Sequence, residues 1–207
     1  MKVTFSEYKG WIEKYINNND TREINFQNDV VKRLLEKMFE DYDIVCVDTK
    51  CNDSKNHDYN EYSGMYEDSN GKHKPTTPDL LICKNWNWYN KDTIYGEKIS
   101  YIATVEVKSP YGSEAIYKKD QEEYPNSWKV KIKRHLDAKR INKVIFTDTF
   151  KWEFYEDNYE NFKTICLVNK KKRGRGYSYE WKNEKNANDT FNKLLNKLNQ
   201  FLKPNNL

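Results

Sequence analysis

Apolar residues return at helical spacing in three parts of the chain, and they predict three amphipathic helices. A helix that packs one side against a core repeats its apolar residues every three or four positions. Residues 5–16 and 26–39 show this pattern near the start of the chain, and residues 188–202 show it near the end. The second helix has the broadest apolar stripe, and Thr21 or Asn25 is its candidate N-cap.

Short apolar runs bounded by polar residues predict the strands. These runs lie at residues 43–49, 80–83, 102–105, 143–147, 151–155, 164–168 and 177–181. Polar turns separate the later runs, at 148–150 and at the basic segment 170–176. Helices and strands that alternate in this way are typical of an α/β fold.

A basic helix is predicted between the third and fourth runs, at about residues 127–140. Its apolar spacing turns Trp128, Ile132, His135 and Leu136 inward. Its cations are expected to face largely outward: Lys129, Lys131, Lys133, Arg134, Lys139 and Arg140.

The segment 50–74 is polar and has no clear periodicity. A connection of this length is unusual inside a compact domain, and it is often functional or mobile. It could cover a site as a lid, bind a partner, or simply cross between two elements. Rings follow at Trp86, Trp88 and Tyr89, and we expect them to pack on the sheet rather than stack on bases.

Composition bounds the class of protein. The 207 residues carry a net charge of +4, and 15% of them are aromatic, which argues against a disordered chain. A single domain over residues 1–207 is the default at this length. No segment reads as a signal peptide or a membrane span, so a cytoplasmic protein is expected.

The four cysteines show no paired spacing. Cys46 and Cys51, with His57 and His73, form a conceivable zinc set around the polar segment, but zinc ligands usually come in tight pairs. We therefore expect reduced cysteines in a reducing compartment.

Two of the apolar runs carry acidic residues at their ends. Asp79 follows Pro78 and enters the run 80–83, while Glu106 and Lys108 close the run 102–105. Side chains alternate along a strand, so Glu106 and Lys108 are expected on one face. If the two runs pair as neighbouring strands, Asp79 comes close to Glu106, and their oxygens are of the kind that Mg²⁺ prefers.

These residues resemble the motif of the PD-(D/E)xK nuclease superfamily, whose members have the restriction-endonuclease-like fold. Residues 141–155 are also similar to the segment after the catalytic helix in the nuclease domains of type I restriction motor subunits. The resemblance covers about residues 21–155 and implies a mixed central β-sheet flanked by helices. Residues 156–207 would then add C-terminal strands and a helix to that core.

The resemblance also implies roles for individual residues. Asp79 and Glu106 would bind Mg²⁺ or Mn²⁺, with the backbone carbonyl of Val107 as a further ligand. Lys108 would orient or help deprotonate the attacking water and stabilise charge on the scissile phosphate. A further catalytic acid on the first core helix would most simply be Glu23, and the rivals are Asp29 and Glu36.

One departure from the family stands out. The type I subunits often carry Gln and Tyr one helical turn apart on the helix after the lysine strand. The corresponding positions here are Lys131 and His135. The departure weakens membership of that subgroup and leaves the expected metal site untouched.

The basic residues suggest where nucleic acid would bind. Lys129, Lys131, Lys133 and Arg134 lie on the helix that follows the catalytic strand, and phosphate contact is expected there. The basic segment 170–175 is an alternative contact, or else a solvated hairpin tip.

The sequence therefore predicts a metal-dependent nuclease that hydrolyses DNA phosphodiester bonds in restriction, defence or phage biology. The alternative is an inactive protein of the same fold that binds nucleic acid or a protein partner. An RNA nuclease would share the site and differ in substrate. Double-strand cutting with one site per chain would favour a homodimer.

Overall fold

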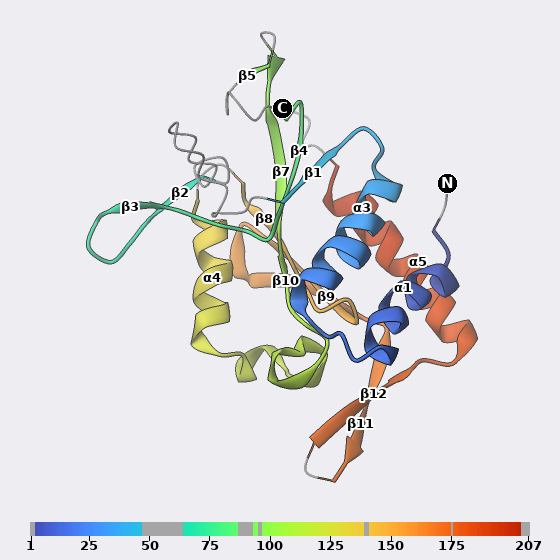
Figure 1. Ribbon diagram of the computed structural model, residues 1–207. Coiled ribbons are helices and arrows are strands. Elements are labelled where there is room, and N and C mark those ends of the chain that lie inside the picture. Colours follow the sequence, from blue (N-terminus) through green and yellow to red (C-terminus); the bar gives the residue numbers. More distant parts are fainter. Residues whose placement is uncertain are drawn as a thin grey trace.

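A mixed six-stranded sheet forms the centre of the computed structural model, which describes residues 3–46, 64–86, 93–94, 97–138, 141–174 and 176–203. Its strand order is β1-β4-β7-β8-β9-β10, and helices flank both faces (Figure 1). The strands are β1 (Asp43–Val45), β4 (Leu80–Lys84), β7 (Ser100–Val107), β8 (Lys143–Thr147), β9 (Lys151–Glu156) and β10 (Asn158–Cys166). The predicted α/β fold with a mixed central sheet is confirmed.

Strand pairing brings the start of β4 and the carboxyl ends of β7 and β8 together at one edge of the sheet. β4 and β7 pair antiparallel with Leu80 opposite Val105, whereas β7 and β8 pair parallel with Val107 opposite Thr147. The residue before β4 therefore lies beside the carboxyl ends of β7 and β8. A parallel pair needs a crossover, and here it carries η3 (Gly112–Glu114), η4 (Ile116–Lys118), η5 (Gln121–Glu123) and α4 (Asn126–Leu136).

The two faces of the sheet are covered differently. α4 packs on one face, where Val144 and Phe146 of β8 join its buried residue Ile132. Ile145, between them in the strand, turns to the opposite face, as strand alternation requires. That face is covered by α1 (Phe5–Asn17), α2 (Glu23–Phe26), η1 (Gln27–Lys32), α3 (Arg33–Met38) and α5 (Glu184–Phe201).

The first predicted helix is correct, but the second begins differently from the prediction. Thr4 caps α1 through a reciprocal capping box with Glu7. Neither Thr21 nor Asn25 caps the second helix, because Arg22 is its N-cap residue and makes no side-chain cap bond. The helix then widens into the π-helical turn η1 before it continues as α3.

The ends of two further helices were predicted wrongly. α4 ends at Leu136 rather than Arg140, and the N–H of Asp137 closes its last turn on the carbonyl of Lys133. α5 begins at Glu184, before the predicted Asn188, because Asn183 accepts a hydrogen bond from the N–H of Asn186. Residues 139–140 lie outside the described residues.

The predicted strand at 164–168 is in fact divided between two sheets. β10 ends at Cys166, and β11 (Val168–Arg173) forms a separate two-stranded sheet with β12 (Gly176–Trp181). Leu167 breaks the strand because it is fully buried and its N–H donates to the carbonyl of Phe150. The basic residues 170–173 therefore lie in a strand of a projecting hairpin (Figure 1), and the turn comes at Gly174, with φ of 58°.

The polar segment contains more structure than was predicted. β2 (Met65–Glu67) and β3 (His73–Pro75) form a hairpin, and the carboxylate of Asp68 accepts bonds from two N–H groups in its turn. Residues 47–63, which hold the rest of this segment and the end of the predicted strand at 43–49, lie outside the described residues. Two short strands, β5 (Thr93–Ile94) and β6 (Glu97–Lys98), precede β7. Within the part of the chain that the structure describes, no helix is both long and apolar enough to cross a membrane.

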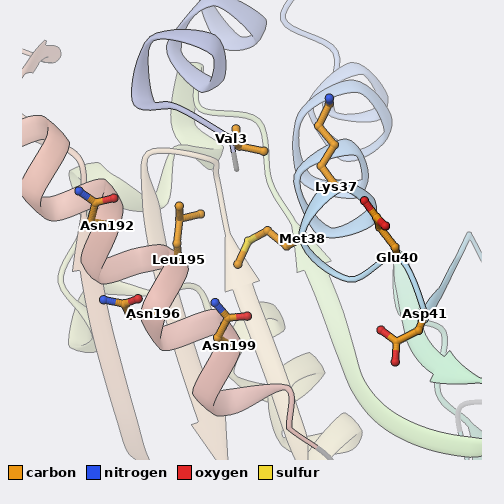
Figure 2. Close-up of a pocket in the computed structure, with 9 residues that line it drawn as sticks. All are labelled: Val3, Lys37, Met38, Glu40, Asp41, Asn192, Leu195, Asn196 and Asn199. Atoms are coloured by element: carbon orange, nitrogen blue, oxygen red, sulfur yellow. The ribbon is translucent and has the colours of Figure 1, made fainter. Parts of the chain in front are cut away.

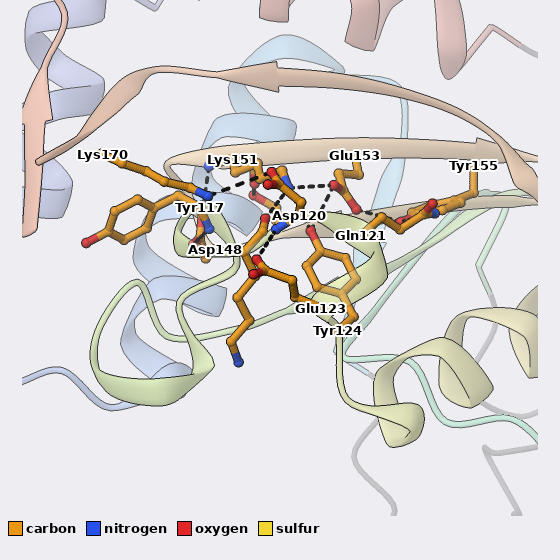
Figure 3. A network of polar contacts seen from close by, with 12 residues as sticks. Tyr117, Asp120, Gln121, Glu123, Tyr124, Asp148, Lys151, Glu153, Tyr155 and Lys170 are labelled. Atoms are coloured by element: carbon orange, nitrogen blue, oxygen red, sulfur yellow. Dashed lines mark hydrogen bonds and ion pairs between the residues drawn. The ribbon is translucent and has the colours of Figure 1, made fainter. Parts of the chain in front are cut away.

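β9 carries a buried ion pair whose two side chains also hydrogen-bond the crossover, at the hydroxyl of Tyr124 and the carbonyl of Lys119 (Figure 3). The ammonium of Lys151 lies 2.9 Å from Glu153 Oε1, and Glu153 also accepts bonds from the hydroxyls of Tyr124 and Tyr155. Burial and the nearby carboxylate of Glu153 raise the pKa of both tyrosines, so their hydroxyls stay protonated as donors. Both charges of the pair are thus satisfied within the core.

The adjacent turn is held by Asp148, which is fully buried. Its carboxylate accepts N–H bonds from Tyr117, Phe150 and Lys151. Thr149, which lies between Asp148 and Phe150 in the chain, has a φ of 71°, an uncommon backbone conformation for a β-branched residue. The carboxylate therefore joins η4 of the crossover to the turn between β8 and β9.

Removing one charge of the buried pair should destabilise the fold. Lys151→Met leaves the carboxylate of Glu153 without its counter-charge, and we expect the free energy of unfolding to fall by about 3–5 kcal/mol. The double variant Lys151→Met/Glu153→Gln removes both charges and should recover much of the loss. Urea unfolding measures both, and a double variant no more stable than the single one would contradict this account.

Candidate active site

Asp79 is anchored at the edge of the sheet by its own backbone and side chain. Its N–H donates to the carbonyl of Val105 (3.1 Å), and its Oδ2 accepts from the N–H of Val107 (2.7 Å). Asp79 is thus hydrogen-bonded to the two residues of β7 that precede and follow Glu106. The predicted pairing of the two acidic runs is therefore confirmed.

Glu106 is buried beside α4, with a side chain that is 1% exposed. His135 of α4 donates from Nε2 to Glu106 Oε1 at 2.7 Å. One turn earlier, the ammonium of Lys131 lies 2.5 Å from Glu106 Oε2 and 3.9 Å from Asp79 Oδ1. The two carboxylates thus face one cation, and that cation belongs to the chain.

Lys131 was predicted to face largely outward, and its side chain is 39% exposed, but its ammonium turns to the two carboxylates, which was not predicted. It shares a face of α4 with His135, because residues four apart lie one turn apart on a helix. The attraction of two carboxylates outweighs solvation of the ammonium. The buried position of His135 is as predicted, although its bond to Glu106 was not.

Lys108 lies just past the end of β7, where strand alternation no longer fixes its side chain. Its ammonium contacts Glu23 Oε2 at 3.0 Å and the carbonyl of Val107 at 2.9 Å. Lys108 and Glu106 are therefore bonded to different helices, α2 and α4. Of the three candidate acids on the second helix, Glu23 is the one that contacts this lysine.

The two rival acids of the second helix are engaged elsewhere. Asp29 accepts a hydrogen bond from the hydroxyl of Tyr15, and Glu36 lies 3.6 Å from the ammonium of Lys32. The structure thus separates Glu23 from its rivals, which helical periodicity alone could not do.

Gln27 is a site residue that sequence reasoning missed. Its amide donates to the backbone carbonyl of Asp79 at 3.0 Å, and the π-helical turn η1 begins at this residue. π-Helical turns inside α-helices are frequent at functional sites. No periodic signal in the sequence marks such a turn, so the role of Gln27 appears only in the structure.

The electrostatics of the acid pair follow from burial and proximity. Burial, together with the neighbouring charge of Glu106, raises the pKa of Asp79 to about 7. Burial would also raise the pKa of Glu106, but its contacts with His135 and Lys131 outweigh burial and lower it. Burial opposes the charge on Lys131, and the two carboxylates overcome it and raise its pKa.

The oxygens at this edge fit a divalent metal ion. Glu106 Oε2 is buried and completes no hydrogen bond despite its short contact with Lys131. It faces the same point as Asp79 Oδ1, and the carbonyl of Val107 lies in the adjacent peptide. Among the described residues no three His, Cys, Asp or Glu side chains are grouped as metal ligands. Mg²⁺ commonly takes only one or two carboxylates, with water and substrate phosphate as the other ligands.

The other predicted nucleic-acid contacts lie along α4. Lys133 and Arg134 are exposed, and they lie over the rings of Tyr159 and Tyr66 at 5.2 and 5.0 Å. Lys129 donates to the carbonyl of Glu122 at 3.0 Å. Their aliphatic stems rest on the protein while their charges remain near solvent.

Other candidates of the sequence do not join this site. Cys46 lies after β1 rather than inside a strand, and its thiol contacts Asn28 and Gln27. Cys51 and His57, the remaining members of the zinc set besides His73, lie outside the described residues. Trp86 packs on the sheet, as expected, and Trp88 and Tyr89 lie outside the described residues.

A hollow of about 710 Å³ opens elsewhere, between α3 and α5 (Figure 2). It is lined by Val3, Lys37, Met38, Glu40, Asp41, Asn192, Leu195, Asn196 and Asn199. These are mostly amide and apolar side chains, and the acid pair is not among them. The hollow is therefore separate from the acid pair at the sheet edge.

Comparisons with protein-family models, with curated proteins and with solved structures found no match to this chain.

The raised pKa of Asp79 predicts a pH dependence of stability. A folded-state carboxyl pKa above its unfolded value makes the fold lose stability as pH rises, here between about 4 and about 7. Asp79→Asn keeps an acceptor for the N–H of Val107 but cannot ionise. Without divalent ions, the free energy of unfolding of the wild type should fall by about 2–4 kcal/mol relative to that of this variant as pH rises across that window. Urea unfolding at several pH values tests this, and parallel stability curves for the two proteins would refute it.

Proposed function

We propose that the chain is a metal-dependent nuclease with a restriction-endonuclease-like core, and that it hydrolyses phosphodiester bonds in DNA. One observation carries the proposal. Asp79 and Glu106 face a single cation at the sheet edge, and Lys108 lies next to them, bonded to Glu23. This is the set of residues that the resemblance to the PD-(D/E)xK superfamily implies.

Each residue has a role that its position supports. Asp79 and Glu106 would hold Mg²⁺ or Mn²⁺ with the carbonyl of Val107, and such an ion supplies Lewis-acid stabilisation of charge on the phosphate. Lys108 would orient the attacking water and neutralise charge that develops on the scissile phosphate. Glu23 fixes the ammonium of Lys108 in place, and Gln27 fixes the backbone of Asp79.

The ammonium of Lys131 favours a second candidate function. It already supplies one positive charge to the two carboxylates without a metal ion, as expected for a protein of nuclease-like fold that binds nucleic acid or a protein partner without cutting. In that case Asp79 and Glu106 would have no catalytic role. Cleavage experiments separate the two functions.

Cleavage of supercoiled DNA, linear DNA and RNA with Mg²⁺ or Mn²⁺ tests the nuclease directly. Asp79→Asn and Lys108→Met should each lower the rate about 100-fold or more, since both remove charge that acts on the transition state. Lys193→Met, which changes an exposed lysine of α5 on the opposite face of the sheet, is the matched control. Cleavage that survives both site variants, or no cleavage by folded wild type, would reject the nuclease.

The basic face of α4 generates a separate prediction. Lys133→Ala and Arg134→Ala should each weaken DNA binding with little regard to sequence and lower the slope of log affinity against log salt by about one. Lys193→Ala should change neither quantity. Fluorescence anisotropy at several salt concentrations gives both, and slopes equal to that of the wild type would remove α4 from the interface.

A further inference from the structure

The cation that faces the two carboxylates is a side chain, and this has a consequence for metal binding. Lys131 Nζ lies 2.5 Å from Glu106 Oε2 and 3.9 Å from Asp79 Oδ1. These are the oxygens that the proposed nuclease would offer to its metal ion. The inference below rests on that proposed function.

The contacts of His135 and Lys108 leave Lys131 as the cation beside Glu106 Oε2 and Asp79 Oδ1. His135 engages the other oxygen of Glu106, so Oε2 is the one that remains for a cation. Lys108, the other ammonium nearby, is held by Glu23 and by the carbonyl of Val107. Lys131 is thus the built-in counter-ion of the acid pair.

An ammonium and a divalent ion cannot share this position. Unit charges about 4 Å apart repel strongly even at intermediate polarity, and a divalent ion doubles the effect. The carboxylate of Glu106 is 1% exposed and fixed by His135, whereas the side chain of Lys131 is 39% exposed on a flexible stem. The lysine, rather than the acid, is the group that can move.

We propose that Lys131 competes with the divalent ion for Asp79 and Glu106, and that metal binds only when this ammonium leaves. Lys131 thereby sets the metal concentration that the site requires. In the metal-free protein its single positive charge offsets part of the charge of the acid pair, and in the metal-bound protein its charge faces solvent.

The competition is tested by metal affinity, measured by calorimetric titration of Mn²⁺ and Mg²⁺ into metal-free protein. Lys131→Met keeps most of the stem and removes the charge, and it should bind Mn²⁺ at least about tenfold more tightly than wild type. Lys193→Met is the control and should bind as wild type does. Added Mn²⁺ should also raise the melting temperature of Lys131→Met more than that of wild type.

Amine labelling of the wild type gives a second measurement that needs no variant. A limiting dose of an acetylating reagent should modify Lys131 slowly without metal and several-fold faster with saturating Mn²⁺, while labelling of Lys193 stays constant. Lys131 is free to react only when it has left the carboxylates.

The outcomes separate this inference from the proposed function. Equal metal affinity of wild type and Lys131→Met, or Lys131 labelling that Mn²⁺ leaves unchanged, would overturn the competition while the metal site stands. Metal binding by neither protein would overturn both the competition and the metal-dependent nuclease. Tighter binding by Lys131→Met together with faster labelling of Lys131 would establish the competition.

Discussion

The close approach of two carboxylates at the edge of the sheet is the constraint on which the rest of the site depends. Asp79 is tied to β7 by its backbone and side chain, and Glu106 points from that strand into a buried position under α4. Buried like charges repel, so one of them takes up a proton or a cation neutralises them. Both responses apply here: burial and the charge of Glu106 raise the pKa of Asp79, and the ammonium of Lys131 lies against Glu106.

This constraint explains why elements distant in sequence converge here. α4 supplies Lys131 and His135 because the crossover between two parallel strands must lay a helix across the sheet. The second helix supplies Glu23 and Gln27 from its first turns. Lys151 and Glu153 of β9 hydrogen-bond the carbonyl of Lys119 and the hydroxyl of Tyr124 in the crossover, so packing of the core and placement of the site are linked.

Much of the fold and the acid pair could be predicted from sequence, because they follow from periodicity and from a short motif. Asp79 and Glu106 were placed together by assuming that two apolar runs pair, and they do. The contact of the Lys131 ammonium with the carboxylates could not be predicted, because a lysine on an amphipathic helix normally faces water and only the tertiary structure brings the carboxylates within its reach. Gln27 was missed for a related reason: its contact depends on a π-helical turn that has no sequence signature. The strand break at Leu167 likewise arises from a long-range bond to Phe150.

The most direct test of the account is a crystal structure of the protein soaked in Mn²⁺, with the ion located by its anomalous scattering. The account predicts one strong peak within bonding distance of Asp79 Oδ1 and Glu106 Oε2, with the ammonium of Lys131 moved away. Lys131 still between the carboxylates, with no peak beside them at saturating Mn²⁺, would contradict it.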